Sequence, residues 1–463
     1  MKPDDQRKEN VQIAYIGGGS RGWAWGLMSD LAAEKELAGT VKLYDIHHEA
    51  AAQNAVIGNR LSQDADTKGK WRYEAVPALK DALQGADFII ISILPGTFAE
   101  MESDVHLPEE YGIYQSVGDT VGPGGLVRAL RTIPLYVEIA NAIKQHAPDA
   151  WVINYTNPMT LCTRTLYEVF PEVKAIGCCH EVFGTQQLLA SMVEHKLGIA
   201  SVDRREIKVN VLGINHFTWL DRASYQGIDL FPLYREFVEE HYADGYEGKK
   251  KGHWLNDHFA SAQRVKFDLF RKYGMIAAAG DRHLAEFMPG ELYLKDPETV
   301  QGWKFSLTKV DWRKKNQAEL YAKGQRLAAG EEAFVVKPTG EEGIEMIKAL
   351  LGMGELITNV NMPNRGQIEG FPAAAVVETN AVFGYNHVSP ILAGKLTPEV
   401  EQLVLPHVTN QEMTLQAAMN KDKALALQAF MNDPLVRLTE EAGAELFDKM
   451  LQNTKAMLPG WEL

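Results

Sequence analysis

The sequence has few cysteines, no long apolar run and no excess of positive charge, and each of these absences excludes a class of protein. Three cysteines among 463 residues are too few, and odd in number, for a disulfide framework. This favours a reducing, cytoplasmic location. No run of about 18 apolar residues occurs, so we expect no membrane span. The first ten residues are charged and lack the apolar core of a signal peptide.

The charge balance also limits the partners. A formal net charge of −14 argues against nucleic acid or an anionic membrane as a partner. It leaves room for a small anionic substrate that is held by a few local arginines. The length, with 46% apolar and 23% charged residues, is enough for two domains with sizeable cores.

The first half of the chain alternates short β-branched runs with helix-like spacers. We expect its strands at residues 11–16, 41–46, 86–93, 151–155 and 174–177. This alternation is typical of an α/β fold with a doubly wound parallel sheet, so we predict a Rossmann-like domain over residues 1–200. Beyond a further strand at 206–213 the pattern changes to mixed α+β with long helices. It predicts a second, α+β domain over residues 201–463.

A glycine-rich turn follows the first expected strand and opens the first expected helix. Its sequence, Gly-Gly-Gly-Ser-Arg-Gly, matches G-x-G-x-x-G, which lets backbone N–H groups approach a pyrophosphate at a helix N-terminus. Asp45 ends the second strand, where a carboxylate binds ribose hydroxyls and repels the 2′-phosphate of NADP. The sequence therefore predicts an NAD site. Its turn residues are Gly17, Gly19, Ser20 and Gly22.

Two more turns lie where strands of this sheet are expected to end. Pro95 belongs to the turn after the third expected strand, and Asn154 begins an Asn-Tyr-Thr-Asn-Pro turn after the next. Ligands bind to open α/β sheets at the carboxyl ends of the strands. The second turn either simply ends a strand, or its asparagines orient a nicotinamide or hold substrate hydroxyls.

A thiol, an imidazole and a carboxylate stand together in the Cys-Cys-His-Glu sequence at residues 178–181. A simple dehydrogenase has no use for a cysteine here, whereas thiolate and imidazole groups are metal ligands. In an extended backbone Cys178 and Cys179 point in opposite directions, so only one of them faces the cleft. His216 follows another expected strand. The cysteine is either a small core residue or, with His216, half of an open coordination set.

Two further segments carry groups that suit acid–base chemistry and substrate binding. Asp281 is a candidate general base, and Arg282 a candidate contact for an anion or a hydroxyl group, unless their segment is a solvated loop. Asp119 lies in a glycine-rich segment that is too rigid for an ordinary surface loop, and it is suited to bond hydroxyl groups. Arg128 and Arg131 come one turn later, where a solvated helix surface is the alternative.

The ordered set of these motifs resembles glycoside hydrolase family 4 over nearly the whole chain. The set comprises residues 16–20, 118–125, 154–158, 179–182, 215–216 and 364–372. Members resemble lactate and malate dehydrogenases in fold, yet they hydrolyse glycosides with NAD and usually Mn²⁺. The resemblance implies hydride removal from C3, loss of the acidified C2 proton to a base, metal stabilisation of the enediolate and elimination of the aglycone. Water then adds, and C3 is reduced again.

The resemblance also implies roles for individual residues. Cys179 and His216 would bind the metal, and Asp281 would be the base at C2. His180 would be the acid that assists departure of the aglycone. The substrate would be contacted by Asp119, Asn154 and Arg282.

The substrate is expected to be a small-molecule sugar without a phosphate. In relatives that act on 6-phosphosugars an Asp or Asn follows the ligand cysteine, whereas this chain has His180. Residues 179–186 resemble α-glycosidases of unphosphorylated sugars, and among them those that cleave α-D-galacturonides from pectin fragments. A uronate carboxylate needs an arginine, for which Arg282, Arg128 and Arg365 are the candidates. Glu181 would disfavour an anion unless it points away.

Several alternatives stay open at this point. Within the family they are α-galactosidase and α-glucosidase. Outside it they are an NAD-dependent 2-hydroxy-acid dehydrogenase, which has no need of Cys179 and His216, and a catalytically silent NAD-binding or regulatory protein. Because relatives are often dimers or tetramers, the resemblance also implies a homo-oligomer.

Overall fold

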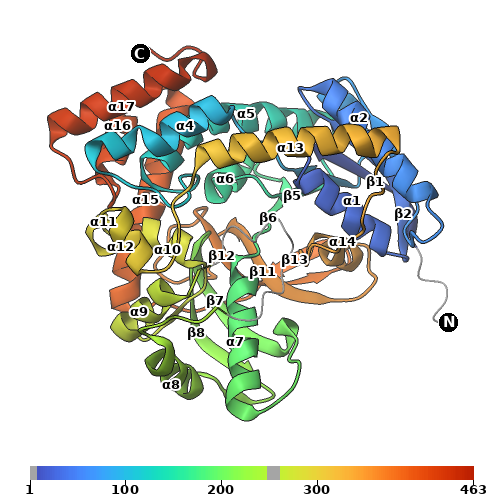
Figure 1. Ribbon diagram of the computed structural model, residues 1–463. Coiled ribbons are helices and arrows are strands. Elements are labelled where there is room, and N and C mark those ends of the chain that lie inside the picture. The colour runs from blue at the N-terminus through green and yellow to red at the C-terminus, as the bar shows by residue number, and fades with distance from the viewer. Residues whose placement is uncertain (1–7, 248–260) are drawn as a thin grey trace.

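The computed structural model describes residues 8–247 and 261–463, and its centre is a nine-stranded sheet (Figure 1). Six strands from the first half of the chain are parallel: β1 (Lys8–Ile16), β2 (Leu37–Tyr44), β3 (Trp71–Ala75), β4 (Phe88–Ile91), β5 (Trp151–Asn154) and β6 (Lys174–Gly177). The sheet order is β13-β12-β11-β6-β5-β4-β1-β2-β3. Every residue of β4, Phe-Ile-Ile-Ile, is buried, as a central parallel strand requires. The doubly wound, Rossmann-like fold is confirmed.

Helices cover both faces of this sheet (Figure 1). They are α1 (Trp23–Ala33), α2 (His48–Gln63), α3 (Leu79–Leu83), α4 (Phe98–His106), α5 (Gly122–His146) and α6 (Met159–Val169). The second expected strand begins earlier than predicted, at Leu37 rather than residue 41. The third expected strand is in fact β4, because the short strand β3 at the edge of the sheet was not predicted.

Three antiparallel strands complete the sheet, and they come from the second half of the chain. They are β11 (Leu356–Pro363), β12 (Val376–Gly384) and β13 (His387–Pro390), joined to β6 where Asn361 pairs with Gly177. Helices α13 (Val310–Ala329) and α14 (Gly343–Leu350) return as well, and Leu327 and Ile344 pack into the same core as Trp25. The first sheet therefore crosses the boundary that we expected at residue 200.

A second, four-stranded sheet lies beside the first. It contains β7 (Ile207–Ile214), β8 (Phe217–Tyr225), β9 (Ile228–Asp229) and β10 (Ile276–Ala277), which are antiparallel. Its helices are α7 (Glu181–Leu197), α8 (Phe231–His241), α9 (Arg264–Tyr273), α10 (Asp281–Glu286), α11 (Gly290–Tyr293) and α12 (Pro297–Gly302). Short 3₁₀ turns occur at η2 (Pro108–Tyr111), η3 (Arg204–Glu206) and η5 (Lys455–Met457).

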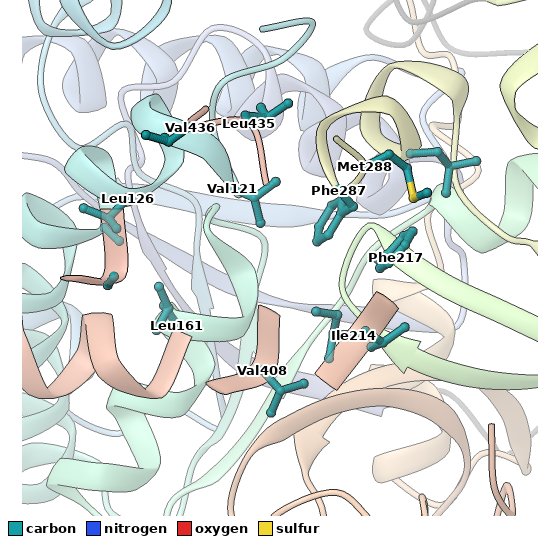
Figure 2. Close-up of a cluster of buried hydrophobic side chains, with 14 of the residues drawn as sticks. Val121, Leu126, Leu161, Ile214, Phe217, Phe287, Met288, Val408, Leu435 and Val436 are labelled. Atoms are coloured by element: carbon teal, nitrogen blue, oxygen red, sulfur yellow. The ribbon is translucent and has the colours of Figure 1, made fainter. Parts of the chain in front are cut away.

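The chain ends in three helices, α15 (Pro398–Asn420), α16 (Lys423–Asn432) and α17 (Glu440–Thr454). They enclose the largest apolar cluster, in which Val121, Phe217, Phe287, Val408 and Leu435 meet from five segments (Figure 2). The rings of Phe217 and Phe287 stack with their centroids 4.6 Å apart. This packing brings together the loop before α5, the β7–β8 turn and α10.

None of the helices in the described ranges is both long and apolar enough to cross a bilayer, as expected. Most of the charged N-terminal segment lies outside the described residues.

Candidate functional site

The glycine turn joins β1 to α1 and is held from two sides. Gly17 has a φ of +98°, and a Cβ there would lie 2.0 Å from the backbone oxygen of Ser92 at the end of β4. Only glycine fits such a close approach. The buried side chain of Asn54 donates from Nδ2 to the carbonyl oxygens of Gly18 (2.8 Å) and Ser20 (2.9 Å). Asn54, in α2, was not predicted, and nothing in its local sequence indicates this role.

Asp45 lies beside this turn, immediately after β2. Its carboxylate accepts hydrogen bonds from the N–H groups of Gly19 (2.9 Å) and His47 (2.8 Å) and stays half-buried. Gly22 is the residue before the first turn of α1, and the Ser20 hydroxyl accepts from its N–H group at 3.4 Å. A turn of this composition at a helix N-terminus, with a carboxylate at the neighbouring strand end, fits a dinucleotide.

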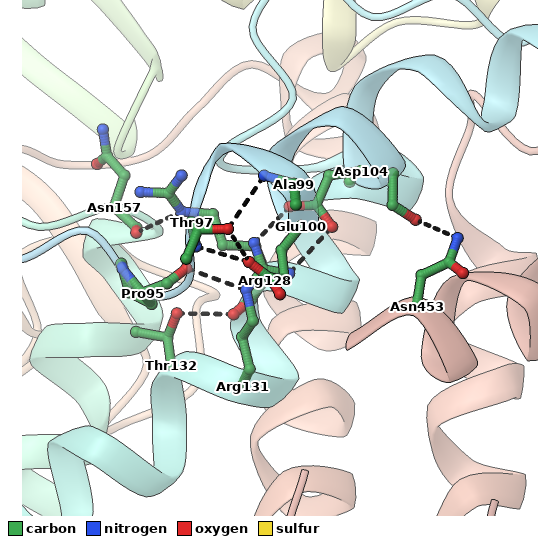
Figure 3. A network of polar contacts seen from close by, with 12 residues as sticks. Pro95, Thr97, Ala99, Glu100, Asp104, Arg128, Arg131, Thr132, Asn157 and Asn453 are labelled. Carbon is green, nitrogen blue, oxygen red and sulfur yellow. Dashed lines mark hydrogen bonds and ion pairs between the residues drawn. The ribbon is translucent and has the colours of Figure 1, made fainter. Parts of the chain in front are cut away.

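Pro95 lies in the turn after β4, where a buried ion pair holds it (Figure 3). Arg131 donates from Nε to the Pro95 carbonyl oxygen at 3.0 Å and from Nη1 to Oδ1 of Asp104 at 3.0 Å. Arg131 is 1% exposed. The interpretation of Arg128 and Arg131 as solvated helix residues is therefore wrong. Both are buried, because α4 packs over the first turns of α5.

The Asn-Tyr-Thr-Asn-Pro turn follows β5, but its two asparagines differ. The Asn154 side chain is fully buried and engaged, since Oδ1 accepts from the Tyr136 hydroxyl (2.5 Å) and Thr156 N (3.1 Å) and Nδ2 donates to Thr156 O (3.1 Å). These hydrogen bonds hold the turn in place. The half-buried Asn157 instead donates from Nδ2 to Oδ2 of Asp119 at 3.3 Å.

Three side chains from separate segments form a candidate metal centre. Ligand atoms of Asp119, His216 and His283 all lie within 4.8 Å of one another. The rings of His216 and His283 are tilted by 31° with centroids 3.7 Å apart, and Nδ1 of His216 is 2.8 Å from the Thr120 hydroxyl. One carboxylate and two imidazoles are a donor set that suits a divalent transition metal such as Mn²⁺. His283 was not predicted, although it stands two residues after Asp281.

The electrostatics of this cluster favour the forms that bind a cation. Burial and, after it, the neighbouring His283 lower the pKa of His216 to about 3. Burial alone would raise the pKa of Asp119, but His216 and Arg128 outweigh it and bring that pKa to about 2. Neutral imidazole and ionised carboxylate are the states in which these side chains bind metals.

The two adjacent cysteines have different surroundings. Cys178 packs into the apolar core on one face of the main sheet. Cys179 is also buried, but its thiol faces the polar side chains of Asn215 and Glu378, and burial raises its pKa well above the ordinary value. Among the described residues, the Cys179 thiol is not part of the cluster of Asp119 and the two histidines. The structure thus places Cys179 near this region without bringing it and His216 into one set.

His180 stands between two carboxylates. Its Nδ1 lies 3.1 Å from Oε1 of Glu341, and its Nε2 lies 3.7 Å from Oε1 of Glu181. Burial alone would lower the pKa of His180, but Glu341 and Glu181 raise it to about 9. A protonated imidazole at neutral pH can act as an acid. Glu181 points toward α10, where its Oε2 accepts from the N–H group of Gly280 at 2.5 Å.

Asp281 is the first residue of α10 and is fully buried, not part of a solvated loop. Its Oδ1 accepts from the backbone N–H of Lys266 at 3.1 Å, while its buried Oδ2 accepts no hydrogen bond from the residues that the structure describes. Burial raises the pKa of Asp281. The ammonium group of Lys266 donates to the Thr185 hydroxyl at 2.9 Å, and burial lowers its pKa to about 8. A desolvated carboxylate with one unused oxygen is suited to be a general base.

Arg282 follows in the same helix and is buried against the loop that carries Asp119. Its Nε donates to the Ser116 carbonyl oxygen at 3.1 Å and its Nη2 to the Thr308 hydroxyl at 2.8 Å. The Ser116 hydroxyl donates in return to the Arg282 carbonyl oxygen at 2.5 Å. The structure therefore brings Arg282 to the same side of the site as Asp119.

Comparison with known families agrees with this arrangement. A model of the family 4 glycosyl hydrolases matches residues 12–195, and a model of the C-terminal domain of that family matches residues 211–436. The chain belongs to the family 4 glycosyl hydrolases. It is therefore a glycosidase by family rather than a 2-hydroxy-acid dehydrogenase.

Individual relatives narrow the comparison. The chain is 62% identical, over 100% of both chains, to a protein of Thermoanaerobacterium saccharolyticum named alpha-galacturonidase. It is 56% identical to a Bacillus subtilis protein of the same name, covering 96% of this chain and 97% of the other. The crystal structure of the lplD protein from Bacillus subtilis has a TM-score of 0.91 at 56% identity and covers 96% of this chain and 100% of that one.

A more distant structure confirms the fold alone. A 6-phospho-beta glucosidase from Thermotoga maritima, solved with manganese, NAD⁺ and glucose-6-phosphate, has a TM-score of 0.77 at 20% identity. It covers 96% of this chain and 99% of that one.

Proposed function

We propose that this protein hydrolyses α-D-galacturonides, of the kind released from pectin, with the help of NAD and a divalent metal, Mn²⁺. The observation that carries the proposal is the 62% identity over the full length of a relative named alpha-galacturonidase. A Bacillus subtilis relative named alpha-galactosidase is only 29% identical over 91% of this chain.

NAD binding is proposed for the glycine turn and the strand ends beside it. Gly17, Gly19, Ser20 and Gly22 would hold the pyrophosphate, and Asp45 the ribose. The turn with Pro95 lies after β4, next to β1 in the sheet, and would line the same edge. The chemistry that NAD supplies when bound is reversible hydride transfer at C3 of the sugar.

Metal binding is proposed for His216, with Asp119 and His283 as the residues whose ligand atoms gather around it. Cys179 is retained as a further proposed ligand on the strength of the family resemblance. The chemistry that the metal supplies when bound is Lewis acidity toward the sugar oxygens at C2 and C3.

The proton transfers are proposed for Asp281 and His180. Asp281 would remove the proton from C2, because its Oδ2 is buried and unused. His180 would protonate the departing aglycone oxygen, because Glu341 and Glu181 hold its imidazole in the charged form. Asp119 and Arg282 are proposed to contact the substrate, whereas Asn154 is proposed to position the turn that carries Asn157.

The experiment is a panel of p-nitrophenyl α-D-galacturonide, α-D-galactoside, α-D-glucoside and α-D-glucuronide, with NAD⁺ and Mn²⁺ present. We expect the galacturonide to have the highest kcat/KM, and no net NADH to accumulate because C3 is reduced again in each turnover. Preference for the galactoside or the glucoside would replace the proposed substrate with that of another family member. A lack of turnover on all four would favour a catalytically silent protein.

We also propose a cytoplasmic location and a homo-oligomer of two or four chains. A metal-binding thiol at Cys179 needs a reducing compartment, because thiolates oxidise readily. Light scattering on the purified protein measures the number of chains, and fractionation of the source cells tests the location.

A further inference from the structure

The C-terminal ends of α7 and α8 meet at a distance from the site described above. Helix α7 begins directly after His180 and runs for 17 residues, or about 25 Å, to Leu197 (Figure 1). Helix α8 ends at His241. The rings of His195 and His241, each in the last turn of its helix, have their centroids 6.2 Å apart. The two helix ends are therefore in contact through their imidazoles.

Three side chains in these last turns carry groups that bind metals. Ligand atoms of His195, Glu240 and His241 all lie within 4.8 Å of one another. Atoms that share a zinc ion each lie about 2.0–2.2 Å from it, so small rotations of these side chains bring all three to a single ion. Two imidazoles and one carboxylate are a donor set that zinc and similar divalent cations bind.

Aromatic packing holds the two imidazoles in place. The centroid of the buried Phe237 ring lies 4.4 Å from that of His241 and 6.4 Å from that of His195. The Tyr246 ring lies 5.1 Å from the His241 ring. Nε2 of His241 is buried and makes no hydrogen bond with the residues that the structure describes. Rings that are already fixed by their neighbours lose little freedom when a metal binds.

The surrounding charges also favour a cation. The C-terminal end of an α-helix carries a partial negative charge, and two such ends meet here. Glu240 adds a full negative charge, and its present partner is Lys196. Nζ of Lys196 lies 2.5 Å from Oε1 of Glu240 and 3.5 Å from Oε2 of Glu236. Lys196 therefore keeps a carboxylate partner in Glu236 when Glu240 binds a metal.

We propose that His195, Glu240 and His241 form a second metal site, for Zn²⁺ or a similar divalent cation, that joins the end of α7 to the end of α8. The site is open to solvent, since His195 and Glu240 are exposed. It lies at the far end of α7 from the proposed acid–base groups, so the ion stabilises the contact between the two helices and takes no part in hydrolysis. This inference does not depend on the proposed function.

The test counts the zinc ions bound per chain, with a chromophoric zinc indicator as competitor, after metals have been removed by dialysis against a chelator. We expect one zinc ion to bind at least about 10-fold more weakly in His195→Gln and in Glu240→Gln, because loss of a group that only supports a ligand already costs about 10- to 100-fold. Both residues are exposed, so neither substitution should disturb folding. Hydrolysis of p-nitrophenyl α-D-galacturonide should be unchanged in both variants.

The matched controls are His387→Gln and Glu239→Gln. His387 is an exposed imidazole in β13, and Glu239 is an exposed carboxylate next to Glu240 that pairs with Arg271 at 3.2 Å. Both controls should bind zinc as the unchanged protein does. Lys196→Met should instead tighten the binding by about twofold to fivefold, because the ammonium group no longer competes for Glu240.

Thermal unfolding gives a second readout. A cation that binds the folded chain raises Tm, so Zn²⁺ should raise the Tm of the unchanged protein and of the controls more than that of His195→Gln and Glu240→Gln. Equal zinc binding in the unchanged protein and in both of these variants overturns this inference and leaves the proposed function standing. Absence of galacturonide hydrolysis in the unchanged protein overturns the proposed function and leaves the difference in zinc binding unaffected.

Discussion

The nucleotide end and the sugar end of the site are built in different ways. The glycine turn and Asp45 come from one β-α-β segment of about thirty residues, in which Gly17 and Gly18 donate to the Tyr44 carbonyl oxygen and Gly19 donates to the Asp45 carboxylate. The proposed metal and sugar groups come from the loop before α5, the start of α7, the β7–β8 turn and α10. The apolar packing around Phe217 and Phe287 (Figure 2) and hydrogen bonds such as that from Arg282 to the Ser116 carbonyl oxygen bring those segments together.

The difference shows which groups determine the binding of the nucleotide and which determine the binding of the metal and the sugar. A local motif binds its ligand through the turn itself, so single side-chain changes should weaken it gradually. A site assembled from distant segments depends on a few side chains, and the loss of one of them is not compensated by the others. The predictions below should therefore separate the two ends, from the largest effect to the smallest.

Loss of a central metal ligand should have the largest effect. His216→Ala removes an imidazole from the cluster with Asp119 and His283, and we expect kcat to fall on the order of 10³-fold, since Lewis-acid stabilisation is worth several kcal/mol. Binding of Mn²⁺, followed by electron paramagnetic resonance, should weaken in parallel. The dissociation constant for NAD should stay unchanged, and a matching loss of NAD binding would show that the two ends are not independent.

Asp281→Asn should follow, with a loss in kcat of at least about 10²-fold, as for removal of a general base. Its specific signature is loss of exchange between the C2 proton of bound sugar and solvent, measured by nuclear magnetic resonance. Exchange at the unchanged rate in this variant would assign the base to another residue. Metal and NAD binding, measured on the same sample, serve as the control.

The adjacent cysteines provide an internal comparison. Cys179→Ser should weaken Mn²⁺ binding by about 10- to 100-fold if the thiol belongs to the coordination sphere. Cys178→Ser should leave Mn²⁺ binding unchanged, because Cys178 packs into the apolar core beside Tyr155. Equal metal binding in both variants would mean that Asp119, His216 and His283 hold the ion without the thiol.

Asp45→Asn should have the smallest effect. We expect the dissociation constant for NAD to rise about tenfold, because one charge-assisted hydrogen bond to the ribose is lost. The ratio of the dissociation constants for NADP and NAD should fall as well, because the side chain at position 45 no longer repels the 2′-phosphate. Fluorescence titration with both nucleotides measures this, and an unchanged ratio would remove Asp45 from the cofactor site.

The same contrast explains what could be predicted from the sequence. The parallel strands and the glycine turn were predicted, because buried β-branched runs and G-x-G-x-x-G are local patterns. Strands β11 to β13 were not assigned to the first sheet, since nothing local to residues 356–390 indicates that they pair with β6.

Within the site, the residues that sequence reasoning missed share one property: their roles depend on distant partners. His283 lies beside Asp119 and His216, and Asn54 donates to the carbonyl oxygens of Gly18 and Ser20. Asn154 shows the reverse case. It lies at the carboxyl end of β5, where ligands bind, but its side-chain amide is already hydrogen-bonded to Tyr136 and Thr156.

The central claim is that the glycosidic bond breaks by elimination after removal of the C2 proton, with Asp281 and the metal cluster placed to assist it. The most direct measurement is hydrolysis of p-nitrophenyl α-D-galacturonide in D₂O with NAD⁺ and Mn²⁺, followed by mass and proton analysis of the galacturonate formed. The account predicts deuterium at C2 of the product. A product with its original hydrogen at C2 would contradict it and indicate direct displacement at C1.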